Sequence, residues 1–112
     1  MSVPWYEPFG MVPIEAAVCG VPSIVSSVGG HLDTVVDEVT GLLVPPRDPA
    51  GLARRLRRLL RGADLRARLG AAGTHQARAY TWESLARTMQ THYQEVRESV
   101  AHLVPRIAPS TA

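Results

Sequence analysis

Two glutamates near the start of the chain have the chemistry to hold a sugar attached to a phosphate. Glu7 lies in an expected loop, and Glu15 lies inside the helix expected to follow it. Carboxylates accept hydrogen bonds, so both can receive them from sugar hydroxyls. Between them, the amides of Gly10, Met11 and Val12 are expected to lack partners at the helix N-terminus, where the helix dipole favours a phosphate. A sugar attached to a phosphate would therefore use both parts of this site, the carboxylates for its hydroxyls and the amides for its phosphate.

Glycine and proline set the start of that helix. Gly10 allows a tight turn, and Pro13 is tolerated only in the first helical turn. Apolar residues at helical spacing then continue as far as Cys19. We therefore expect a loop that ends at Gly10 and a short helix directly after it.

Two short parallel strands are expected next to the helix. Residues 22–26 form a β-branched run typical of a buried parallel strand, and Gly29 and Gly30 follow its carboxyl end. Ligands of α/β sheets bind at that end, where the backbone must approach closely. A second strand is predicted over Leu42–Val44, because Pro45 and Pro46 stop it. The fold class is therefore α/β, with few short parallel strands and mostly helix.

Three residues beside these elements have alternative interpretations. His31 opens a short helix whose apolar stripe is Leu32, Val35 and Val36. Next to a diglycine it is either a ligand contact or, more commonly, a structural or solvated residue. Trp5 and Tyr6 either flank the sugar site or pack in the core on each side of a turn.

The second half of the chain is predicted to be helical. Asp48 is an expected N-cap, and Gly62 closes the helix that it begins. Asp64 is expected to cap a second helix that runs to about residue 79. Gly70 and Gly73 each weaken that helix by about 1 kcal/mol relative to alanine, so tertiary packing must hold it.

A last helix is capped by Thr81 and runs from Trp82 to about Val100. Its apolar stripe is Trp82, Leu85, Met89, Tyr93 and Val96. Residues after it are expected to form a disordered tail. The predicted divisions are a donor-binding part (1–47), a helical pair (48–79), a C-terminal helix (80–104) and the tail (105–112).

Composition and charge fit one small globular domain. The 112 residues are 46% apolar and carry a net charge of +2, and all twelve positive residues are arginine. No apolar run reaches the ~18 residues of a membrane span, and the N-terminus lacks a secretory pattern. A single cysteine, Cys19, fits a reducing compartment. We therefore expect a cytoplasmic protein, and the arginine-rich composition suggests a GC-rich bacterial genome.

The arginines crowd between Arg54 and Arg68, which raises nucleic acid or an anionic membrane as partners. The leucines of this segment share one helical face, so the arginines fall mostly on the other. A solvated helix face is the preferred interpretation. Nucleic acid is not expected as a partner, and peripheral membrane contact is the weaker alternative.

The motif E-P-F-G-x4-E-A-x3-G-x-P resembles the donor-site signature of family 4 glycosyltransferases. The resemblance continues through the diglycine, through Thr40–Pro46 and Asp48-Pro49, and into Tyr80–Glu83, and covers about residues 3–97. Asp33 departs from it, because the family usually has glutamate there. The resemblance implies the GT-B architecture of two Rossmann-like lobes, of which this chain matches the second half of the second lobe.

The resemblance also implies roles for individual residues. Glu7, the catalytic candidate, would accept hydrogen bonds from the donor sugar, and Glu15 from the ribose. The backbone of Phe9–Val12 would hold the diphosphate and stabilise charge on the leaving group. The donor-binding set is Glu7, Phe9, Gly10, Met11, Val12, Glu15, Gly29 and Gly30. No metal or cofactor is expected beyond the nucleotide-diphosphate sugar, since one cysteine and four scattered histidines form no ligand set.

The function implied is retaining glycosyl transfer when a missing N-terminal lobe or a partner chain completes the site. The acceptor site and a cationic pair on the diphosphate would both precede Met1. The alternative is a non-catalytic donor-binding module or a subunit of a split enzyme, and the isolated chain is expected to be inactive. Two hydrolase interpretations are weaker. A glycosidase pair needs one raised pKa, whereas an anion site favours ionisation, and a Ser26-His31-Asp33 triad lacks its nucleophile elbow.

Overall fold

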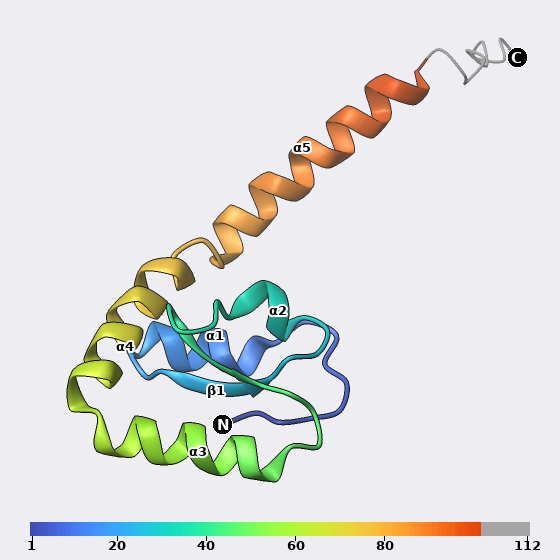
Figure 1. The fold of residues 1–112 in the computed structure, drawn as a ribbon. Coiled ribbons are helices and arrows are strands. Elements are labelled where there is room, and N and C mark those ends of the chain that lie inside the picture. Colours follow the sequence, from blue (N-terminus) through green and yellow to red (C-terminus); the bar gives the residue numbers. More distant parts are fainter. Residues whose placement is uncertain (102–112) are drawn as a thin grey trace, which may run out of the picture. The chain divides into compact units, whose positions relative to one another are not determined.

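The computed structural model describes residues 1–101, which form two compact units. The first unit spans Met1–Tyr80 and contains every strand and the first four helices (Figure 1). The second unit begins at Thr81, and its described part contains one helix. Each unit is described by itself below.

Two parallel strands form the centre of the first unit. β1 (Ser23–Ser26) pairs with β2 (Gly41–Val44) in a register that places Ser23 opposite Gly41 and Ser26 opposite Val44. All four residues of β1 are buried, as the β-branched run predicts. On the other side of β1, Ser2 forms an isolated parallel bridge with Val25. The prediction of few short parallel strands among helices is therefore confirmed.

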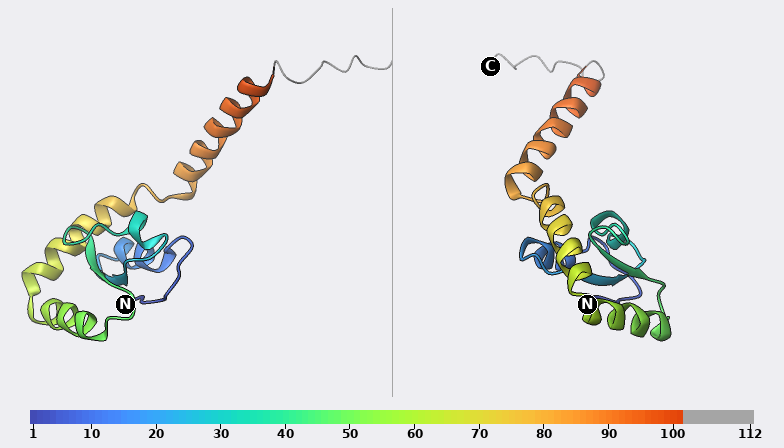
Figure 2. Two further views of the ribbon diagram at one scale, coloured as in Figure 1. Left: turned by 45° about the vertical axis from the view of Figure 1, so that its right-hand side comes forward. Right: turned by 60° about the vertical axis from the view of Figure 1, so that its left-hand side comes forward.

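α1 (Met11–Val18) precedes β1 and packs against α4 (Ala63–Ala77), which runs alongside it (Figure 2). The hydroxyl of Thr74 on α4 donates to the carbonyl of Ala17 at 2.9 Å. A Cβ on Gly70 would lie 2.2 Å from the carbonyl oxygen of Gly20, so only glycine permits this approach. Tertiary packing holds the glycine-containing helix, as expected from its weak intrinsic propensity.

α3 (Pro49–Arg61) follows β2 and covers the sheet. The Asp48 carboxylate accepts from the amide of Gly51 at 2.8 Å, which confirms the predicted N-cap. The core consists of Ile24, Leu42, Val44, Leu59 and Leu69. Asp64 is not the cap of α4: it lies in the first turn, and Gly62 is the N-cap. The earlier start is possible because α3 ends at Arg61 and Gly62 alone makes the turn.

The helix predicted after the diglycine is shorter than expected. α2 (His31–Thr34) is one turn long, and the predicted helical positions Val35 and Val36 lie outside it. Val35 has an extended backbone and a buried side chain, and the Val36 amide donates to the Thr40 hydroxyl at 2.9 Å. The Val35 amide makes the last helical bond, to His31, and the Val36 amide is diverted to Thr40, so the helix ends here.

Trp5 and Tyr6 are not core residues of the first unit. Their exposed fractions are 80% and 66%, so the interpretation as core aromatics is wrong. Pro4 directly before them accepts a hydrogen bond from the Ser26 hydroxyl at 2.7 Å. That bond fixes the start of the loop and leaves both aromatic rings outside.

In the described part of the second unit, the helix is α5 (Trp82–Val100). Thr81 caps it as predicted, because its hydroxyl accepts from the amide of Ser84 at 3.1 Å. Every residue of the predicted apolar stripe is exposed: Trp82, Leu85, Met89, Tyr93 and Val96. The predicted tail, residues 105–112, lies outside the described residues. None of the helices described in residues 1–101 has both the length and the apolar character needed to cross a membrane.

Candidate functional site

The carboxylate of Glu7 turns back onto its own loop. Its Oε1 accepts from the amide of Gly10 at 2.9 Å and, more weakly, from the amide of Phe9 at 3.4 Å. The positive end of the α1 dipole attracts the negative charge to this position. The prediction that the Gly10 amide is free is therefore wrong, because a side chain three residues upstream can reach it. A carboxylate with one oxygen held by backbone amides has a fixed orientation.

Two amides of the predicted anion site remain without an acceptor in the described part of the chain. They belong to Met11 and Val12, the first two residues of α1, and both residues are exposed. Gly10 has φ of +90°, a left-handed conformation that glycine adopts without strain. The tight turn at Gly10 therefore places a carboxylate and two unpaired donors on one helix N-terminus.

The diglycine supports this loop from the carboxyl end of β1. The amide of Gly30 donates to the carbonyl of Glu7 at 2.8 Å. A Cβ on Gly29 would lie 2.0 Å from the Glu7 carbonyl oxygen, and one on Gly30 would lie 2.2 Å from that of Phe9. Glycine is needed here for contact between two backbones of the same chain. The predicted contact of Gly29 and Gly30 with a donor stays a prediction.

Glu15 and Phe9 occupy the outer side of the loop and of α1. Glu15 is exposed and makes no ion pair or side-chain hydrogen bond within residues 1–101, so its carboxylate is accessible to a ligand. The ring of Phe9 packs edge-on against Tyr80, with 6.5 Å between centroids and an interplanar angle of 82°. The Tyr80 hydroxyl donates to the carbonyl of Asp33 at 3.1 Å. Tyr80 is thus a support of the site that sequence reasoning identified only as part of a motif.

His31 is fully buried beneath the loop. Its Nδ1 lies 3.0 Å from the carbonyl oxygen of Ser26, the last residue of β1. Because a carbonyl only accepts, this nitrogen carries the proton. Of the two interpretations of His31, the structure favours the structural one. A buried histidine cannot be distinguished from a solvated one in a loop by sequence pattern alone.

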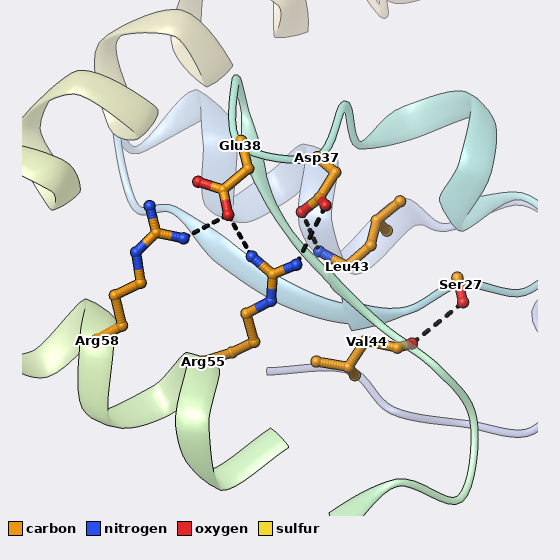
Figure 3. A network of polar contacts seen from close by, with 7 residues as sticks. All are labelled: Ser27, Asp37, Glu38, Leu43, Val44, Arg55 and Arg58. Atoms are coloured by element: carbon orange, nitrogen blue, oxygen red, sulfur yellow. Dashed lines mark hydrogen bonds and ion pairs between the residues drawn. The ribbon is translucent and has the colours of Figure 1, made fainter. Parts of the chain in front are cut away.

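The arginine face of α3 is largely exposed, as predicted, but two of its arginines are paired with acids just before β2. Arg55 and Arg58 on α3 both contact the carboxylate of Glu38, and Arg55 also reaches Asp37 at 3.2 Å (Figure 3). The Asp37 carboxylate in turn accepts from the amide of Leu43 at 2.8 Å. The hydrogen bond from Arg58, reinforced by Arg55, lowers the pKa of Glu38. The positive charges of Arg55 and Arg58 are therefore paired within the chain, which leaves less positive charge to bind a nucleic acid.

Two open hollows of the first unit lie away from the loop. They have volumes of about 190 and about 360 Å³ and share Val44, Pro45 and Asp48 as lining residues. Neither is lined by Glu7, Glu15 or residues 9–12. Among their charged side chains, the Asp48 carboxylate caps α3 and Arg55 belongs to the ion-pair network. We place the candidate site at the α1 N-terminus, where unpaired donors and an oriented carboxylate occur together.

Comparison with known proteins identifies relatives over most of the chain. The family model for "Glycosyl transferases group 1" matches residues 2–76. A D-inositol 3-phosphate glycosyltransferase of Frankia alni is 41% identical over 95 residues, which are 85% of this chain and 23% of that protein. One of the same name from Salinispora tropica is 41% identical over 96 residues, 85% of this chain and 20% of that protein.

Solved structures agree with these relatives. Sucrose-phosphate synthase from Thermosynechococcus elongatus superposes with a TM-score of 0.79 at 43% identity, over 88% of this chain and 25% of that one. Anabaena Alr3699/HepE in complex with UDP-glucose gives a TM-score of 0.64 at 25% identity, over 86% and 25% of the two chains. The chain therefore spans about a quarter of the length of such relatives. The predicted Rossmann-like fragment of a GT-B lobe is confirmed.

Proposed function

The chain belongs to the group 1 glycosyl transferases, and we propose that it forms the donor-binding wall of a retaining glycosyltransferase. The donor is a nucleotide-diphosphate sugar. The observation that carries this proposal is the helix N-terminus itself, where the Glu7 carboxylate is held by the Gly10 amide next to the unpaired amides of Met11 and Val12.

Each group at this terminus has a defined chemical role. One oxygen of Glu7 is occupied by backbone amides, which leaves the other to accept hydrogen bonds from hydroxyls of the donor sugar. The amides of Met11 and Val12 donate to the diphosphate and stabilise the charge that develops as it leaves. Glu15 accepts from the ribose. The Phe9 and Gly10 amides thus orient the acid, and the next two amides bind the anion.

The relatives support a nucleotide-sugar donor without fixing its identity. Anabaena Alr3699/HepE is described in complex with UDP-glucose, so that compound is the first probe to use. One wall of a cleft makes only part of the contacts of a complete site. We expect the 112-residue chain to bind UDP-glucose with Kd near 1 mM, which corresponds to about −4 kcal/mol.

Transfer needs an acceptor held in line with the donor. Correct orientation of two reactants contributes ~7–11 kcal/mol of a barrier, and this chain by itself has no acceptor lobe among its described elements. The 112-residue chain should therefore show at most slow hydrolysis of the donor. When an N-terminal lobe is supplied, fused or in trans, transfer should appear.

The test is a titration of the isotope-labelled chain with UDP-glucose, followed through the amide resonances of Met11 and Val12. Glu7→Gln and Glu15→Gln should each weaken binding, whereas Glu83→Gln, an exposed acid on α5, should not. If the Met11 and Val12 amides stay unmoved while the chain binds, the site has been assigned to the wrong place. Transfer by the unsupplemented chain, abolished by Glu7→Gln, would require an acceptor site within these 112 residues.

A further inference from the structure

The loop that carries Glu7 is held by a chain of contacts that starts at the end of β1. Ser26 donates from its amide to the carbonyl of Ser2 at 3.1 Å and from its hydroxyl to that of Pro4 at 2.7 Å. Its carbonyl accepts from the amide of Val28 at 2.9 Å and from His31 Nδ1 at 3.0 Å. Ser26 therefore anchors both the segment that enters the loop and the ring that lies beneath it.

The ring of His31 forms the floor under Gly10. Its Cδ2 lies 3.1 Å from the position that a Cβ on Gly10 would occupy, and the hydroxyl of Thr34 lies 2.7 Å from the same position. The neighbouring ring atom, Nε2, is buried and has no hydrogen-bond partner in the described part of the protein. An unpaired buried polar atom costs about 1–3 kcal/mol, so packing stability by itself does not account for histidine at this position.

Gly10 needs such a floor because glycine does not hold one conformation by itself. Its left-handed φ of +90° aims the amide at the Glu7 carboxylate, 2.9 Å away. Without Cβ, many other conformations are accessible, and most of them turn the amide elsewhere. Contacts from His31 and Thr34 restrict these alternatives.

We propose that His31 is a positioning residue for Glu7: it is tied to Ser26 through Nδ1, and its opposite ring edge fixes the Gly10 amide that orients the carboxylate. The effect on donor binding rests on the function proposed above. The effect on the loop does not, because it concerns contacts within the ligand-free chain.

The first test uses the native 112-residue chain without ligand. Nitrogen-15 correlation spectra of the histidine rings report which nitrogen of His31 carries the proton, and nuclear Overhauser spectra report contact between its Hδ2 and the α protons of Gly10. A proton on Nδ1 together with that contact is expected. A proton on Nε2, or the lack of the contact in the folded chain, would overturn the proposal.

The second test compares three substitutions. His31→Asn keeps an N–H for the Ser26 carbonyl but removes the ring edge under Gly10, whereas His31→Phe keeps a ring and loses the N–H. Leu59→Ala is the matched control: Leu59 is 8% exposed and belongs to the core, so the substitution destabilises the core, and it lies on α3, which packs on the sheet and α4 rather than on the loop. Amide exchange at Gly10 should accelerate about tenfold in His31→Asn, which corresponds to the loss of one charge-assisted hydrogen bond. In His31→Phe the acceleration should be smaller, because a ring remains under Gly10. Equal acceleration in His31→Asn and Leu59→Ala would show a merely structural role.

Titration with UDP-glucose then separates this inference from the proposed function. If the native chain binds, His31→Asn should weaken the affinity about tenfold while Leu59→Ala leaves it unchanged. If native chain does not bind UDP-glucose although Gly10 exchange responds to His31→Asn as expected, the donor assignment fails and the positioning role stands. If it binds and His31→Asn leaves both Gly10 exchange and affinity unchanged, the positioning role is refuted.

Discussion

A pair of glycine substitutions in α4 provides a sharp test of how the first unit is packed. Gly70 and Gly73 are three residues apart in the same helix, and both are buried. Alanine in a helix interior is favoured over glycine by about 1 kcal/mol, so propensity alone predicts that both substitutions stabilise the chain. The structure predicts opposite signs.

The difference comes from what each new Cβ meets. At Gly70 it would lie 2.2 Å from the carbonyl oxygen of Gly20, a backbone atom at the end of α1 that cannot move without the helix. At Gly73 its nearest neighbours are the Cβ of Ala17 and the carbonyl oxygen of Thr40, both at 3.4 Å, which is ordinary contact. Overpacking of this kind typically costs about 1–3 kcal/mol.

Relief of the Gly70 clash requires α1 and α4 to separate. That movement also stretches the bond from the Thr74 hydroxyl to Ala17, whose loss would add about 0.5–1.5 kcal/mol. After the gain in propensity is subtracted, Gly70→Ala should destabilise by roughly 1–3 kcal/mol. Gly73→Ala should be neutral or stabilise by up to about 1 kcal/mol.

Urea unfolding followed by far-ultraviolet circular dichroism measures both effects. Tryptophan fluorescence would be a poor probe, because Trp5 and Trp82 are 80% and 81% exposed in the folded chain. All variants should be compared at one chain concentration, since any self-association would change apparent stability. Stabilisation by both substitutions would show that α1 and α4 do not pack as described.

Three further predictions concern the supports of the site and of the sheet. Asp48→Ala should destabilise the chain by about 1 kcal/mol in urea unfolding, because it removes the α3 cap, and Asp48→Asn should restore most of the loss. Arg58 and Arg55 lower the pKa of Glu38, so their contribution to stability is present above the ordinary glutamate pKa and is lost as the pH falls through the lowered value. Glu38→Gln should therefore make the urea midpoint less sensitive to acid as the pH falls from neutral, and an unchanged pH dependence would contradict the network. Tyr80→Phe should keep the contact with Phe9 but lose the hydrogen bond to the Asp33 carbonyl. The chain should lose about 0.5–1.5 kcal/mol of stability, and the amide shifts of Asp33 and Thr34 should change. Unchanged shifts would show that Tyr80 does not support the site.

Local features of this fold could be predicted from the sequence. The helix start at Gly10, the caps at Asp48 and Thr81 and the two short strands all depend on residues within three or four positions of one another. The motif around Glu7 and Glu15 identified the family for the same reason. Even the missed bond from Glu7 to the Gly10 amide was local, and a carboxylate three residues before a helix start was the signal for it.

The support of the loop could be seen only in the tertiary structure. His31 meets Ser26 and Gly10, Tyr80 meets Phe9 and Asp33, and Arg55 meets Asp37 and Glu38, across separations that no helical or strand periodicity encodes. The sequence alone determined which groups have the chemistry for a sugar and a phosphate. Which of them are oriented, buried or already paired depends on how β1, α2 and α3 pack, because hydrogen bonds and steric contacts between distant residues exist only once the chain has folded.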